Sequence, residues 1–180
     1  EIKGRPGGQP SGPPSQLYPE KRGGGSVGEA ARQVLIQKAD ASFVHDIYEI
    51  GKLCFSDAWR EETVAHDMEG DHSEYFIALV DGKTAGYGCY WFIMDEGQLL
   101  NIGVRPEYRK KGIGALLLEA GLEEAVKRRM SSLFLEVRVS NEEARRLYKK
   151  YGFRMLGTRK GVYDLPREDG YIMSKELRKH

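Results

Sequence analysis

Cysteine is scarce in this chain, and its two thiols are not spaced for a metal or redox site. Cys54 and Cys89 are the two cysteines among 180 residues. Their separation excludes the Cys-x-x-Cys patterns of zinc sites and of disulfide exchange. A chain of this length can bury a core without disulfides. We therefore expect two reduced and buried thiols, as is usual in the cytoplasm.

The sequence also lacks a long apolar segment and a charge excess of one sign. No run approaches the roughly 18 apolar residues of a membrane span, and the N-terminal segment has no apolar core of a signal peptide. Lys and Arg number 28 against 27 Asp and Glu, a net charge of +1, whereas general nucleic-acid binders are strongly basic. We expect a cytoplasmic monomer or weak dimer without membrane or direct nucleic-acid contacts. His66-Asp67 and Asp71-His72 lack further ligands, so no metal is expected.

Proline and glycine are concentrated at the N-terminus. Residues 1–30 hold 8 of the 22 glycines and 5 of the 7 prolines. Such a composition cannot bury enough apolar surface to offset the entropy of ordering the chain. We expect residues 1–30 to be a disordered tail, a tag or a linker. Residues 31–180 then form one domain, since a domain usually has about 100 to 200 residues.

Hydrophobic periodicity predicts an alternation of strands and helices in this domain. The helix expected at 112–130 carries apolar residues on more than one face and should be well buried. Ser140-Asn141-Glu142-Glu143 predicts a capping box that opens a helix ending at Gly152. Strands are expected at 32–39, 75–80, 84–94, 97–104, 132–139, 153–162 and 170–174, and helices at 40–53, 60–69, 112–130 and 140–151. This order indicates an α/β fold built on a mixed sheet.

One loop carries the strongest chemical signal. Arg109-Lys110-Lys111-Gly112-Ile113-Gly114 lies between a predicted strand and the long predicted helix. Glycines let a ligand approach the backbone, and a helix N-terminus offers unpaired N–H groups with a partial positive charge. With three basic side chains at the same place, this pattern predicts a phosphate or pyrophosphate site. The alternative is a glycine turn with solvated cations. A dinucleotide fingerprint is excluded, because it needs a third glycine.

The same loop matches the Arg/Gln-x-x-Gly-x-Gly/Ala signature of the GCN5-related N-acetyltransferases (GNAT). The similarity extends to Asn101-Ile102-Gly103-Val104, Leu135-Glu136-Val137-Arg138, Ser140-Asn141, Leu147-Tyr148 and Gly152-Phe153. Over residues 34–177 the chain resembles the RimI group, the ribosomal-protein-alanine N-acetyltransferases. The resemblance implies an α/β GNAT fold. In it, helices flank a mixed, mostly antiparallel central sheet whose splayed strands hold acetyl-CoA.

The resemblance also implies roles for particular residues. Glu136 takes the position of the general base and Tyr148 that of the general acid. Trp59 and Tyr163 lie where the family lines its peptide groove, although ordinary packing is the alternative for both. The residues expected at acetyl-CoA are Ile102, Gly103 and Val104 beside the pantetheine arm, Arg109, Lys110, Lys111, Gly112, Ile113 and Gly114 around the pyrophosphate, and Asn141 near the arm.

The residue types agree with the two catalytic roles. Glu136 points away from the apolar side of its strand, and a carboxylate among apolar residues is a functional candidate. The alternative is an ion pair with Arg138 or with a neighbouring strand. Tyr148 lies on the apolar stripe of its helix. It is therefore either a core tyrosine or an acid that protonates a departing thiolate.

We expect direct attack of an amine on acetyl-CoA, because neither cysteine lies in the matched motifs. An α-amine has a pKa of about 7.7 to 8.0 and a lysine about 10.4, so removing the lysine proton costs about 3 kcal/mol more. This difference favours an N-terminal α-amine as acceptor. The resemblance implies the N-terminal alanine of a small-subunit ribosomal protein. A small-molecule amine or lysine acetyltransferase and a non-catalytic acyl-CoA-binding module are the alternatives.

Overall fold

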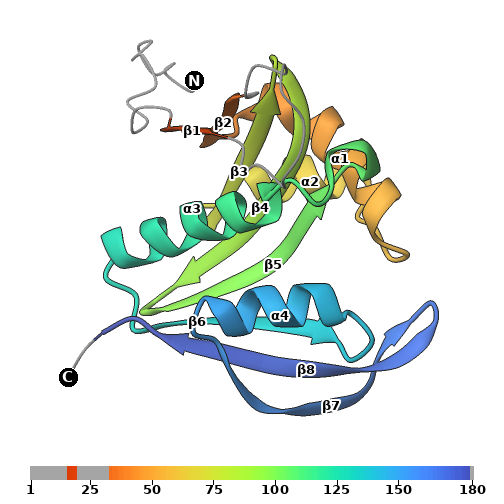
Figure 1. Ribbon diagram of the computed structural model, residues 1–180, viewed down its shortest axis with the longest axis vertical. Coiled ribbons are helices and arrows are strands. Elements are labelled where there is room, and N and C mark those ends of the chain that lie inside the picture. The colour runs from red at the N-terminus through yellow and green to blue at the C-terminus, as the bar shows by residue number, and fades with distance from the viewer. Residues whose placement is uncertain (1–15, 20–32, 179–180) are drawn as a thin grey trace, which may run out of the picture.

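The computed structural model describes residues 16–19 and 33–178. Eight strands form one sheet in the order β1-β2-β3-β4-β5-β6-β8-β7 (Figure 1). Neighbouring strands are antiparallel except β5 and β6, which are parallel. The strands are β1 (Gln16–Pro19), β2 (Gln33–Lys38), β3 (Ser73–Val80), β4 (Lys83–Ile93), β5 (Glu96–Val104), β6 (Ser132–Arg138), β7 (Arg154–Asp164) and β8 (Arg167–Glu176). The helices are η1 (Ala41–Phe43), α1 (Val44–Cys54), α2 (Glu61–Met68), η2 (Pro106–Tyr108), α3 (Ile113–Lys127) and α4 (Glu142–Lys150).

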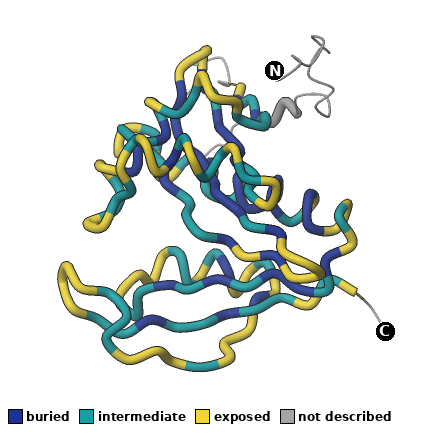
Figure 2. The backbone as a smooth tube through the Cα atoms, turned by 180° about the vertical axis from the view of Figure 1, so that it is seen from behind, coloured by how far each residue is buried: buried dark blue, intermediate teal, exposed yellow. Residues whose placement is uncertain are grey.

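Alternating side chains give the sheet a core on each face. In β3, Phe76 and Ala78 belong to the cluster that includes the buried side chains of α3 and α4. Tyr75 and Ile77 belong to a second cluster, with the buried residues of α1 and α2. The two helix pairs therefore cover opposite faces of the sheet. Figure 2 shows the buried residues concentrated along the central strands.

Helix α3 lies unusually close to the sheet. The Tyr90 hydroxyl donates a hydrogen bond to the Leu117 carbonyl at 2.8 Å, inside the core. A Cβ atom at Gly121 would lie 2.1 Å from the Tyr90 ring, so no larger residue fits there. This contact fixes the height of α3 over β4. The N-terminus of α3 follows the end of β5 after the short loop that contains η2.

The α/β fold and the mixed, mostly antiparallel sheet are confirmed. The predicted capping box is wrong, because Asn141 and not Ser140 is the N-cap of α4. Asn141 Oδ1 accepts a hydrogen bond from the Ala144 N–H at 3.2 Å. The Ser140 N–H instead donates to Glu168 Oε1 at 2.7 Å. Strands β7 and β8 are also longer than predicted, because they pair with each other along a hairpin that extends beyond the core.

The predicted tail at residues 1–30 includes Gln16–Pro19, which pairs with β2 as the strand β1 at the sheet edge. The rest of that segment lies outside the described residues. The assignment of a disordered tail, tag or linker therefore stays a prediction. Within residues 16–19 and 33–178, none of the helices is long and apolar enough to cross a membrane.

Candidate active site

The parallel strands β5 and β6 separate halfway along their length. They pair from Glu96↔Ser132 to Leu99↔Leu135, and no pair follows. A bulge in β5 falls at the same point. Tyr90 of β4 opposes Leu99, whereas its neighbour Cys89 opposes Asn101, so Leu100 is the extra residue. Bulges bend strands and end pairing. From Leu100 onward, β5 thus has an edge that faces β6 without being paired to it.

The separation opens a groove of about 870 Å³. The groove joins residues from α1, β5, the loop before α3, β6, α4 and β7. Every site residue predicted from the sequence lines it except Gly103 and Lys111. A Cβ at Gly103 would contact Tyr87 and Ile50 on the other face of the sheet. The Lys111 ammonium lies 6.0 Å from the centre of the Tyr108 ring.

The loop before α3 forms a concave backbone. Lys110 and Gly112 both have left-handed φ values, 60° and 81°. Gly112 is the N-cap of α3 and brings no side-chain oxygen, so no side chain caps the first N–H groups of the helix. Alternating left-handed residues before a helix N-terminus create a site for anions. Ile113 is only 2% exposed, and its side chain belongs to the core cluster between α3 and the sheet.

Arg109 lies at the junction between this loop and β5. Its Nε donates to the Val104 carbonyl at 3.0 Å, and its Nη2 lies 3.6 Å from Cys54 Sγ. Arg109 therefore ties the loop to the end of β5. The expectation of two buried thiols is half right. Cys89 is buried, whereas Cys54 is half-buried and lines the groove.

Glu136 lies on the part of β6 that is no longer paired with β5. Its Oε2 accepts a hydrogen bond from Arg159 Nη1 of β7 at 3.1 Å. Oε1 is buried and has no hydrogen-bond partner among the described residues. The ion pair that the sequence left open thus exists, but with Arg159. Arg138 pairs with Glu168 instead. Arg159 thus engages one oxygen of the Glu136 carboxylate and leaves the other without a partner in the described structure.

Tyr148 is the buried residue of α4 and also reaches the groove. Its ring packs against Phe153, with the ring centres 5.8 Å apart. Burial raises the pKa of the Tyr148 hydroxyl well above its ordinary value. The phenol therefore stays protonated near neutral pH. Tyr148 is thus a core tyrosine whose protonated side chain also lines the groove.

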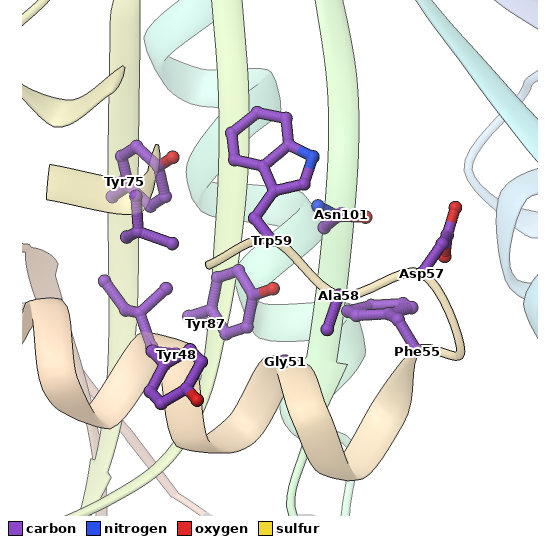
Figure 3. Close-up of a pocket in the computed structure, with 11 residues that line it drawn as sticks. Tyr48, Gly51, Phe55, Asp57, Ala58, Trp59, Tyr75, Tyr87 and Asn101 are labelled. Carbon is purple, nitrogen blue, oxygen red and sulfur yellow. The ribbon is translucent and has the colours of Figure 1, made fainter. Parts of the chain in front are cut away.

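A smaller pocket of about 60 Å³ lies beside the groove (Figure 3). Gly51 of α1, Tyr87 of β4 and Asn101 of β5 contribute to its wall, and Trp59 lies across it. The pocket and the groove share four residues: Phe55, Asp57, Trp59 and Asn101. Trp59 therefore lies at the boundary between the pocket and the groove.

Tyr163 of β7 also lines the groove. Burial and the nearby charge of Glu136 raise its pKa to about 12. The Arg138 guanidinium lies 4.3 Å from the centre of its ring. Arg138 also lines the groove, although the sequence did not predict it as a site residue. Its strand position was the available signal, since Arg138 follows Glu136 by two residues and so shares its face.

Metal-ligand side chains do not cluster in the described part of the chain: no group of three or more His, Cys, Asp or Glu residues there could hold an ion. The groove is lined instead by aromatic rings, backbone and a few charged side chains. Lys110 lies at the α3 end of the groove, whereas Asp57, Glu136 and Arg138 lie towards Tyr163.

Known proteins share this architecture. The Acetyltransferase (GNAT) family matches residues 44–153. A [ribosomal protein bS18]-alanine N-acetyltransferase of Escherichia coli K12 is 36% identical over 129 residues, which cover 71% of this chain and 86% of that protein. An N-alpha-acetyltransferase of Sulfurisphaera tokodaii is 29% identical over 160 residues, covering 81% and 95%.

Solved structures agree with these matches. The crystal structure of the ribosomal-protein-S18-alanine N-acetyltransferase from Escherichia coli aligns with a TM-score of 0.76 and 32% identity, covering 82% of this chain and 96% of that one. NAA60 of Arabidopsis thaliana, solved in complex with acetyl-CoA, has the same fold, with a TM-score of 0.73 at 18% identity over 80% of this chain and 98% of that one. On the fold, the loop signature and these matches, the chain belongs to the GNAT family of acetyltransferases.

Proposed function

We propose that this protein transfers an acetyl group from acetyl-CoA to the N-terminal α-amine of a protein. The acceptor is the N-terminal alanine of a small-subunit ribosomal protein, with Glu136 as base and Tyr148 as acid. One observation carries the proposal: a single groove contains the anion-binding loop, the unpaired edge of β5, Glu136 and Tyr148. Membership of the GNAT family gives the enzyme class, an acyltransferase that depends on acetyl-CoA.

The groove fits acetyl-CoA at both of its chemically distinct parts. The backbone of Lys110, Gly112 and Ile113 forms the concave loop that suits a pyrophosphate. The edge of β5 from Leu100 to Val104 is not paired to β6 and offers backbone groups for the amides of an extended pantetheine arm, as in strand addition, although the Val104 carbonyl already accepts a hydrogen bond from Arg109. Asn141 and Gly114 line the groove between these parts. When bound there, acetyl-CoA supplies a thioester whose carbonyl carbon an amine can attack.

Glu136 and Tyr148 would then divide the proton transfers. Glu136 takes one proton from the α-ammonium, and the freed nitrogen forms a bond to the carbonyl carbon while the carbon–sulfur bond breaks. Tyr148 gives its proton to the sulfur and regains one from the nitrogen as this becomes an amide. The products are the acetylated amine, the thiol and one proton released from Glu136 to solvent. General acid–base assistance of this kind is worth roughly 10²- to 10⁴-fold.

The substrate assignment is supported by the relatives and by the small pocket. Relatives that are 36% identical over 129 aligned residues carry the name of a [ribosomal protein bS18]-alanine N-acetyltransferase. The pocket beside Trp59 measures about 60 Å³, which favours a small first side chain over a large one. A ribosomal acceptor would place the reaction in the cytoplasm. We propose that the enzyme acts there as a monomer or weak dimer, without direct nucleic-acid contacts.

The ribosomal acceptor is tested by comparing cells with and without the gene. Intact-mass spectrometry of the small-subunit ribosomal proteins should find one protein that loses a single acetyl group in the deletion strain. Peptide sequencing should place that group on an N-terminal alanine. Restoring the gene should restore the acetyl group. An unchanged set of masses would overturn the ribosomal assignment, whereas an acetyl group lost from a lysine would favour the lysine alternative.

A further inference from the structure

We propose that Arg138 is a positioning residue that holds the β7–β8 hairpin against the segment between α1 and α2, and so sets the shape of the peptide side of the groove. The inference rests on the proposed function, because it assumes that a peptide enters between these two walls. Arg138 lines the groove two residues beyond Glu136 on β6. Its side chain is therefore on the same face of the strand as the proposed base.

The Arg138 guanidinium contacts both walls. Nη1 donates to the Pro166 carbonyl at 2.9 Å and to Glu168 Oε2 at 3.3 Å, both in the hairpin. Nη2 donates to Ser56 Oγ at 3.3 Å, in the segment that follows α1. The Arg138 Cζ atom also lies 4.3 Å from the centre of the Tyr163 ring. A planar guanidinium with five N–H donors can make these contacts at once, whereas the compact ammonium of lysine cannot.

Backbone pairing does not hold the two walls together at this point. Strands β5 and β6 are unpaired beyond Leu99 and Leu135, so the sheet leaves the width of the groove open there. Arg138 and Ser56 lie 82 positions apart in the chain and are joined by a side-chain hydrogen bond across that opening. Side chains therefore set this distance, and Arg138 reaches both sides.

Glu168 extends the contact to the start of α4. Its Oε1 accepts from the Ser140 N–H at 2.7 Å, and its Oε2 accepts from Ser140 Oγ at 3.0 Å. Ser140 directly precedes Asn141, which caps α4 and lines the groove. Arg138 is thus connected to the hairpin, to the α1–α2 segment and to the cap of the helix that carries Tyr148.

A misplaced peptide wall should affect peptide substrates more than small amines. The test measures kcat and KM for Arg138→Gln with a hexapeptide that has a free N-terminal alanine, and with alaninamide, which has the same amine but no second residue. We expect kcat/KM for the peptide to fall roughly 10- to 100-fold, the cost of a small displacement of bound substrate. The fall with alaninamide should be much smaller, and KM for acetyl-CoA should stay close to wild type.

Arg145→Gln is the matched control. Arg145 also donates to a backbone carbonyl, that of Val139 at 2.7 Å, and also lies over a tyrosine, with its guanidinium 4.9 Å from the centre of the Tyr171 ring. It does not line the groove. Its loss should lower the melting temperature comparably while leaving the ratio of peptide to alaninamide turnover unchanged. Arg138→Lys should not restore that ratio.

Hydrogen exchange separates this inference from the proposed function. Arg138→Gln should speed amide exchange in residues 163–168 and 55–57, and Arg145→Gln should not. Equal losses on peptide and alaninamide, or unchanged exchange in both segments, would overturn the positioning role. If the wild-type protein acetylates no free N-terminal peptide, the proposed function fails, and the exchange result alone then decides whether Arg138 holds the two walls.

Discussion

Glu136, which lines the groove, forms an ion pair with Arg159, whose Nη1 donates to Glu136 Oε2 at 3.1 Å. The Arg159 side chain is 57% exposed, whereas that of Glu136 is 26% exposed. The pair is therefore open to solvent on the arginine side, and exposed pairs contribute little to stability. Glu136 keeps a second, buried oxygen without a hydrogen-bond partner in the described structure. Two roles for Glu136 are therefore distinguished by experiment: a general base, or one half of an ion pair that stabilises the fold.

Removing the Glu136 carboxylate should slow turnover strongly while acetyl-CoA still binds. Glu136→Gln keeps the shape of the side chain and loses its basicity. We expect kcat to fall by about 10² to 10⁴, while acetyl-CoA binding measured by calorimetry stays near wild type. Arg159→Gln breaks the same ion pair and should retain most of the turnover. Similar losses in both variants would mean that Glu136 acts only through the ion pair.

Tyr148→Phe tests the proton donor. The ring and its packing against Phe153 are kept, and only the hydroxyl is lost. We expect kcat to fall about 100-fold, with little change in KM for acetyl-CoA or in melting temperature. Tyr151→Phe is the control, because Tyr151 follows the same helix and its hydroxyl bonds to Glu119 away from the groove. A Tyr148→Phe enzyme with wild-type kcat would remove Tyr148 from the reaction.

Gly112→Ala tests the anion site. Gly112 has a φ of 81° at the N-cap of α3, a conformation that costs roughly 1 to 2 kcal/mol for a residue with a Cβ. We expect the loop to shift and KM for acetyl-CoA to rise about tenfold, since about 1.4 kcal/mol corresponds to a factor of ten. Gly82→Ala introduces similar strain, at a φ of 77° in the β3–β4 turn, with equally open space around it. An equal rise in both variants would show that strain alone, and not the loop, weakens binding.

Acid should remove the contribution of Glu168 to stability. Hydrogen bonds from the side chain and backbone of Ser140, followed by Arg138, hold its pKa below the ordinary 4.5. Above pH 4.5 the folded protein gains from the ionised form, and the gain is lost as the pH falls through the lower folded-state pKa. The melting temperatures of wild type and Glu168→Gln should therefore differ at neutral pH and converge in acid. A difference that persists in acid would mean that the charge of Glu168 is not the cause.

The sequence predicts most of the fold because its periodicities are strong. Leu133, Leu135 and Val137 alternate along β6 as expected, and all three are buried. Gly112 and Gly114 locate the start of α3 and with it the loop that we propose binds an anion, since they lie where the chain enters the helix after β5. The prediction of Ser140 as the N-cap of α4 is wrong, because its N–H and hydroxyl both donate hydrogen bonds to Glu168, 28 residues away. Local spacing cannot foresee a partner at that distance.

The register between distant strands explains why the sequence did not predict the Glu136–Arg159 pair or the orientation of Gly103. Glu136 meets Arg159 because β7 lies two strands beyond β6, and the β7–β8 pairing shifts between Arg159 and Tyr163. An irregular register of this kind has no signature in the residues that flank it. Gly103 likewise faces α1 and not the groove, although the backbone on either side lines the groove. The motif locates the strand, and only the folded register decides which of its residues face a ligand.

The most direct measurement is thiol release from acetyl-CoA with the purified protein and a matched panel of amines. The panel holds peptides with a free N-terminal alanine or serine, the same peptides blocked at the N-terminus but containing a lysine, and spermidine. The α-amine has a lower pKa than a lysine side chain, and the pocket beside the groove is small. We therefore expect turnover on the peptides with a free N-terminus, highest for alanine. Comparable turnover on blocked lysine peptides or spermidine would contradict α-amine specificity. Saturable acetyl-CoA binding without turnover on any member would contradict acetyl transfer to this class of amines.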